Sequence, residues 1–116
     1  LHHNHAEAVR RAGRPAEAEK EFRTTLGART SVLGEAHPDT LSTRMSLALA
    51  VRDQGLLREA AEELEGAMRV SERLERTVAV VGAVRTTLLE TYEMLDAKEP
   101  GAGWGEKATA LKLGNP

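Results

Sequence analysis

The 116-residue sequence contains no cysteine, which excludes disulfide bonds and thiolate metal sites. Only 3% of its residues are aromatic, so the core must be built mainly from Leu, Val, Ala and Met, a composition that favours packed helices over a β-sandwich. No apolar run approaches the roughly 20 residues that span a bilayer. The opening LHHNHAEAVRR also lacks the apolar segment of a signal peptide. We therefore expect a cytoplasmic protein with no membrane partner.

Charge of one sign is not in excess either. The formal net charge is −2, so no global basic character favours nucleic acid as a partner. With 41% hydrophobic and 29% charged residues, the chain has the composition of a folded domain, and its length suits one small domain. The sequence begins without Met and inside a helical pattern. We expect residues 1–116 to be a single domain that is a fragment of a longer protein.

What the sequence does contain is an internal repeat with a period of 42 residues. AVRRAGRPAEAEKEF, which begins at Ala8, matches AVRDQGLLREAAEEL, which begins at Ala50. A weaker third copy begins near residue 79 at a shift of 41. Apolar residues recur at helical spacing twice in each copy, which predicts repeat units near 1–34, 35–75 and 76–113. The predicted helices cover residues 1–12, 15–32, 38–54, 57–74, 78–96 and 105–113.

The segment VLGEAHPDT, residues 32–40, interrupts this helix-forming sequence and is predicted to join two units. Gly34 breaks one helix, and Pro38 suits the first position of the next helix, where its missing N–H has no helical partner. His37 or a neighbour then serves as the N-cap. No Ser, Cys or Asp/His partner is placed to make a triad with His37, so we interpret it as structural rather than catalytic.

The third unit departs from this pattern. The joint before it reads LERTVAV, residues 74–80, with no Gly and no His-Pro, and Thr77 is its predicted N-cap. Its internal turn is enlarged to DAKEPGAGWG, residues 96–105, in which Pro100 and three glycines do not continue a helix. The short final helix that follows is predicted to cap the array.

The pattern LAxxVxxxGxxxxAxxxLxxA, which runs from Leu47 to Ala67, resembles the tetratricopeptide repeat. The 42-residue period and the linker LGEAHPDTL resemble the long variety found in kinesin light chains and in many actinobacterial repeat proteins. The resemblance covers residues 1 to about 96. It implies an all-α fold, an α-solenoid of about three helical hairpins stacked as a right-handed superhelix. The first helix of each hairpin would then line a concave ligand-binding face.

Three histidines near the start are candidate metal ligands. His2, His3 and His5 cluster there, and His2 and His5 have the i, i+3 spacing of a metal pair on a helix. However, the 42-residue shift places His5 at the position of Leu47, a predicted core residue, and no third fixed ligand is evident. We therefore predict no metal site.

No other pattern supports catalysis or a cofactor. GAGWG, residues 101–105, lacks the Lys-Ser/Thr and the preceding strand of a phosphate-binding loop. The carboxylates Glu62, Glu63 and Glu65 are interpreted as a solvated helix face. The chain is predicted not to be an enzyme and to bind no cofactor.

The resemblance implies that peptide-binding residues lie at matching positions of the three first helices. These are His3, Glu7, Arg10 and Arg11 in unit one, Met45, Leu49, Arg52 and Asp53 in unit two, and Thr86, Glu90, Glu93 and Met94 in unit three. The face would run from basic to acidic, and its arginines would suit a peptide carboxylate. The alternative is an ordinary solvated face on which nearby carboxylates neutralise the arginines.

These observations predict a protein- or peptide-binding scaffold module. Two alternatives stay open. One is self-association through the exposed solenoid ends, which include the outer face of the first helix and the last hairpin around Leu111 and Leu113. The other is a sensory or regulatory arm of a larger nucleotide-binding or DNA-binding regulator.

Overall fold

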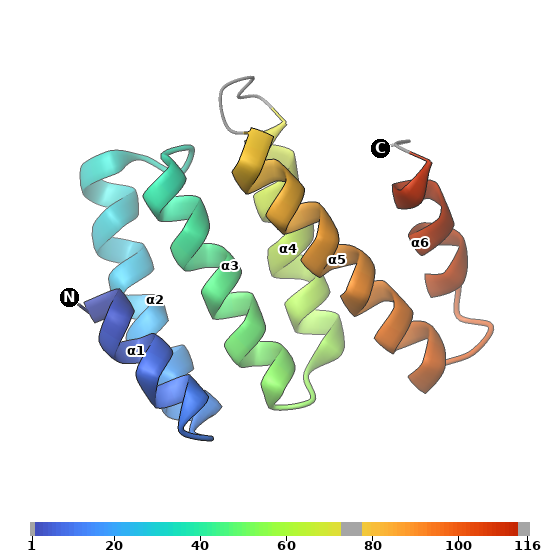
Figure 1. Ribbon diagram of the computed structural model, residues 1–116, viewed down its shortest axis with the longest axis horizontal. Coiled ribbons are helices and arrows are strands. Elements are labelled where there is room, and N and C mark those ends of the chain that lie inside the picture. Colours follow the sequence, from blue (N-terminus) through green and yellow to red (C-terminus); the bar gives the residue numbers. More distant parts are fainter. Residues whose placement is uncertain (1, 73–77, 114–116) are drawn as a thin grey trace.

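The computed structural model describes residues 2–72 and 78–113. Within these residues there are six α-helices and no strand (Figure 1). The helices are α1 His2–Arg11, α2 Pro15–Leu33, α3 Pro38–Asp53, α4 Leu57–Ser71, α5 Val78–Lys98 and α6 Trp104–Lys112. Their ends lie within three residues of the predicted ones, and the all-α prediction is confirmed.

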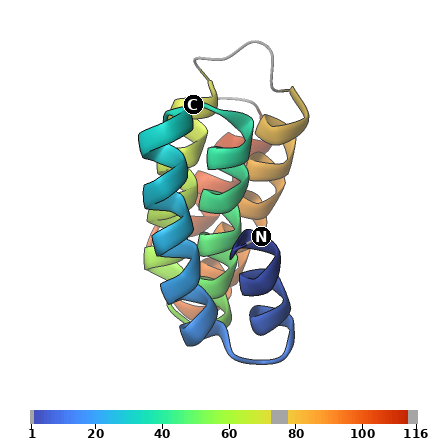
Figure 2. The same ribbon diagram turned by 90° about the vertical axis from the view of Figure 1, so that its left-hand side faces the viewer.

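Consecutive helices form the hairpins α1–α2, α3–α4 and α5–α6, and the hairpins stack side by side. The first helices α1, α3 and α5 lie toward the viewer in Figure 1, with α2 and α4 behind them, and Figure 2 shows the layers from the side. Helix α3 is central, because it packs against α1, α2, α4 and α5. This is the arrangement of a helical-repeat solenoid, as predicted.

The His-Pro joint has the predicted geometry. Gly34 follows α2 with a φ of 88°, and its N–H donates to the carbonyl of Thr30 at 3.0 Å. His37 is the N-cap of α3, since its Nδ1 accepts the backbone N–H of Asp39 at 3.0 Å, and Pro38 opens the helix. The expected role of His37 in closing a joint is therefore confirmed. The predicted N-cap of the next joint, Thr77, lies outside the described residues.

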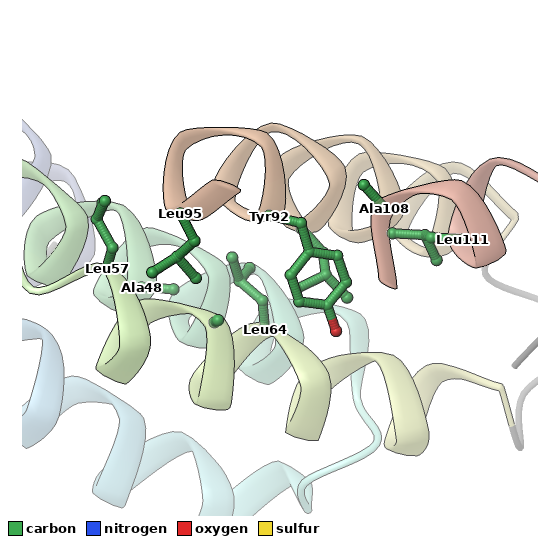
Figure 3. Close-up of a cluster of buried hydrophobic side chains, with 9 residues drawn as sticks. Ala48, Leu57, Leu64, Tyr92, Leu95, Ala108 and Leu111 are labelled. Atoms are coloured by element: carbon green, nitrogen blue, oxygen red, sulfur yellow. The ribbon is translucent and has the colours of Figure 1, made fainter. Parts of the chain in front are cut away.

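The core is shared between neighbouring hairpins. One cluster joins the first two hairpins through Ala6, Ala18, Phe22, Leu47, Ala50, Val51 and Ala60. A second joins the last two and is drawn in Figure 3; its members are Ala48, Leu57, Ala61, Leu64, Leu88, Tyr92, Leu95, Ala108 and Leu111. Alanines at the crossings allow the helix axes to approach closely. Each hairpin therefore completes its hydrophobic core with residues of the next one.

Two expectations about the ends of the array are wrong. The side chain of His5 is 67% exposed, although its repeat equivalent Leu47 is fully buried. Helix α2 of the preceding hairpin covers Leu47, whereas α1 has no such neighbour among the described helices. Leu111, expected at an exposed end, is buried against its own chain, whereas Leu113 is exposed.

Candidate functional site

The residues predicted to bind a peptide lie on the layer of first helices. We call the surface formed by Glu7, Arg10, Arg11, Met45, Leu49, Arg52, Asp53 and Glu90 the first-helix face. Ion pairs link its three helices, from Arg10 of α1 to Asp53 of α3 and from Arg52 of α3 to Glu90 of α5. His3 also belongs to α1, but its side chain is outside the described part of the chain.

Arg10 is held by carboxylates of two hairpins. Its Nε donates to Glu7 Oε1 at 3.2 Å, and its Nη1 donates to Asp53 Oδ2 at 2.9 Å. Burial disfavours the charged form of the guanidinium, but the hydrogen bonds to Glu7 and Asp53 outweigh this and raise the pKa of Arg10. With its side chain only 19% exposed, Arg10 joins α1 to α3 and presents little charge to a ligand.

Arg52 repeats this arrangement one hairpin further along. Its Nη1 donates to Glu90 Oε1 and to the hydroxyl of Thr91, each at 3.4 Å. Neutralisation by internal carboxylates, the alternative left open by the sequence, therefore applies to Arg10 and Arg52. Arg11 differs from both, because its side chain is 76% exposed and its contact with Glu7 is 3.8 Å long.

Of the remaining predicted residues, Thr86 and Met94 are exposed on α5, and the other three fall into two groups. Met45 and Leu49 are half-buried on α3, and the sulfur of Met45 accepts the hydroxyl of Thr87 at 3.8 Å. They give the first-helix face an apolar centre. Glu93 instead pairs with Lys112 of α6 at 3.3 Å. The structure therefore places Glu93 in the last hairpin's own ion pair and not in the network of Arg52 and Glu90.

Sequence reasoning missed a cluster on the other side of α5. The hydroxyl of Tyr92 donates to Glu65 of α4, and Lys107 of α6 lies 3.5 Å from the same carboxylate. Burial, followed by the hydrogen bond to Glu65, raises the pKa of Tyr92 well above its ordinary value. The sequence did contain a signal for this cluster, because Tyr92 departs from the repeat. The equivalent residues of the first two units are Val9 and Val51.

The described residues contain no group of three or more His, Asp or Glu side chains that would hold a metal ion. Among the described helices, none combines the length and the apolar character that crossing a membrane requires. The contacts described above belong to two surfaces, the first-helix face and the cluster of Tyr92, Glu65 and Lys107 on the other side of α5.

Comparison with known proteins assigns the fold to a family. A family model described as tetratricopeptide repeat matches residues 1–73, which is more than half of the chain. A search of curated proteins gives no match. The matched region covers the first two hairpins, whose Gly-bounded helix pairs carry the motif seen in the sequence. The chain belongs to the tetratricopeptide repeat family.

Proposed function

We propose that the chain is a non-catalytic scaffold module that binds a peptide segment of a partner protein along the first-helix face. Tetratricopeptide repeats typically serve as protein-interaction scaffolds. The observation that carries the proposal is the order of side chains across this face. Exposed Arg11 lies on α1, half-buried Met45 and Leu49 lie on α3, and exposed Glu90 lies on α5.

This order favours a partner segment of defined polarity. An acidic residue would pair with Arg11, an apolar residue would cover Leu49, and a basic residue would lie near Glu90. Arg10 contributes less, because a ligand carboxylate would compete there with Glu7 and Asp53, which already hold the guanidinium. An exposed ion pair stabilises by about 0–1 kcal/mol, so the apolar contact must supply a large share of the affinity.

The test reverses one charge on the face and one off it. Arg11→Glu changes the exposed cation of α1, and Arg14→Glu is the matched control in the turn before α2. Arg14 is 70% exposed and lies 3.8 Å from Glu17, much as Arg11 lies from Glu7. A partner segment recovered by affinity capture is then titrated against both variants by calorimetry, at low and at high salt.

We expect Arg11→Glu to weaken binding about three- to tenfold and to reduce its salt dependence, with Arg14→Glu close to the unsubstituted protein. An acidic-to-lysine change in the partner segment should restore binding to Arg11→Glu. Equal effects of the two variants would indicate non-specific attraction. An Arg11→Glu variant that binds as well as the original chain would reject the first-helix face.

A further inference from the structure

A second groove lies between α4 and α6, on the side of α5 away from the first-helix face. Its volume is about 340 Å³. Figure 3 shows Tyr92 reaching from α5 toward α4, with Leu111 of α6 beside it. The apolar lining is formed by Met68, Leu88, Tyr92, Ala110 and Leu111, and the charged rim by Glu65, Arg69, Glu72 and Lys107.

The corresponding groove between α2 and α4 has a similar volume of about 350 Å³ but a charged lining. Arg44 of α3 lies so close to Gly66 that a Cβ there would clash with its guanidinium. Its Nε donates to Glu63 Oε1 at 3.2 Å, and Glu63 also lies 3.8 Å from Arg23 of α2. Arginines and carboxylates therefore occupy this earlier groove.

The later groove lacks this arrangement because one lining residue and one arginine contact differ. Leu64 and Leu111 are 47 residues apart and occupy matching core positions, so Ala110 takes the place of Glu63. Arg85, the repeat equivalent of Arg44, donates instead to the carbonyl of Leu111 at 3.0 Å and so caps the end of α6. With no carboxylate at position 110, the groove stays apolar.

Among the residues that the structure describes, the rim carries one cation without an ion-pair partner. Glu65 accepts the hydroxyl of Tyr92 and pairs with Lys107, which leaves Arg69 without a carboxylate partner in the described parts of the chain. Arg69 lies on the α4 wall, one turn beyond Glu65. Glu72, the residue directly after α4, disfavours a second acidic group at that end of the groove.

From this geometry we infer that the α4–α6 groove binds a peptide segment of a partner protein that inserts one large aliphatic side chain and pairs a neighbouring carboxylate with Arg69. A volume of about 340 Å³ is at the lower end of the range of ligand pockets, which fits one or two side chains rather than a whole helix. An aliphatic side chain in the groove would pack directly against Met68, Leu88 and Leu111, with no water between them. This site is separate from the first-helix face and does not depend on it.

The first test uses a capped heptapeptide of sequence Ser-Asp-Ala-Leu-Ala-Asp-Ser and the 116-residue chain. Trp104 reports binding, because it is the single tryptophan and stacks on Tyr92 with ring centroids 5.9 Å apart. We expect a saturable change in its fluorescence. Peptides with Ser in place of Leu, or with Lys in place of both Asp residues, should bind at least about tenfold more weakly. Equal binding of the Leu and Ser peptides, or no saturation at millimolar peptide, would overturn the proposal.

Protein variants then locate the binding. Ala110→Glu supplies the carboxylate that Glu63 provides in the earlier groove, and we expect it to weaken binding of the Leu peptide at least about tenfold. Ala28→Glu, at an exposed position of α2, is the matched control and should bind normally. Arg69→Ala should remove most of the preference for the Asp peptide over the Lys peptide. Circular dichroism of each variant verifies the fold.

Three outcomes of this series contradict the inference. The first is an Ala110→Glu variant that binds as well as the original chain, and the second is an Ala28→Glu variant that loses binding as much as Ala110→Glu does. The third is loss of the same peptide in Arg11→Glu, which would place its binding on the first-helix face. Failure of the first-helix face in its own test leaves this second site unaffected, so the two proposals fail separately.

Discussion

Replacement of Gly34 by alanine tests the joint between the first two hairpins. The backbone of Gly34 has φ 88° and ψ 157°, a region that is essentially restricted to glycine. A Cβ built on this residue would meet no atom within 4 Å apart from those of Gly34 itself and its two chain neighbours. The substitution therefore adds no clash with a neighbour, and its whole cost is conformational.

The same helix provides a matched control of opposite sign. Gly27 lies inside α2, is exposed, and also has open space around an added Cβ. An alanine there should stabilise the helix by about 0.5–1 kcal/mol, because glycine loses more conformational freedom on folding. Gly34→Ala should destabilise the protein by about 1–3 kcal/mol. The two substitutions add the same methyl group and differ only in the backbone angles that receive it.

The assay is thermal and urea unfolding followed by circular dichroism. At the usual unfolding entropy per residue, 1 kcal/mol corresponds to roughly 4 °C in Tm for a chain of this size. Gly34→Ala should therefore melt about 4–12 °C lower, and Gly27→Ala about 2–4 °C higher. A Gly34→Ala variant as stable as the original chain would refute the argument, whereas destabilisation by Gly27→Ala would show that the control helix is misjudged.

Four further outcomes are expected. Leu47→Ala should cost about 2–5 kcal/mol of unfolding free energy, whereas the repeat-equivalent His5→Ala should change it by less than about 0.5 kcal/mol; equal costs in urea unfolding would contradict the asymmetry of the array. His37→Ala should lower the free energy of unfolding by about 0.5–2 kcal/mol through loss of the N-cap, and His37→Asn should retain most of the N-cap's stabilisation. The hydroxyl of Tyr92, the single tyrosine, should titrate above its ordinary pKa of 10.0 in ultraviolet absorbance. Because the folded-state pKa is raised, this group's contribution to stability is present below the unfolded-state pKa and is lost as pH rises through the folded-state value. If the array self-associates through its exposed end, Leu113→Lys should shift sedimentation toward monomer; a monomer at all concentrations before the change would reject self-association.

The fold was predictable because its signals are local or periodic. Gly34, His37 and Pro38 each act through their own backbone, so their roles follow from residue type and spacing. The 42-residue period then implies that equivalent residues repeat the same packing, as Ala18 and Ala60 do. His5 shows the limit of this reasoning, since equivalence in sequence gives equal burial only where a neighbouring hairpin covers both positions.

The chemistry of the first-helix face was predictable only in part. The repeat placed Arg10 and Arg52 on one surface, and the structure links both to the adjacent hairpin. The carboxylate with which each guanidinium pairs depends on side-chain rotamers and on the distance between helices. The 42-residue period predicts neither of these. Glu93 pairs with Lys112 of α6, whereas Glu90, one turn earlier on α5, pairs with Arg52.

The α4–α6 groove was missed because it lies where the copies differ. Residues that all units share pack one hairpin against the next. Alignment of the units therefore identifies packing residues and not binding residues. Three departures from the repeat open the groove and leave a cation on its rim: Tyr92 in place of Val51, Ala110 in place of Glu63 and Arg69 in place of Gly27.

The match between α4 and α6 also depends on the turn at residues 99–103, which changes the shift from 41 to 47 residues. Only the burial of Ala108 and Leu111 against Leu64 fixes that register. In a repeat array, the positions that break the repeat are therefore the first place to look for a second binding site.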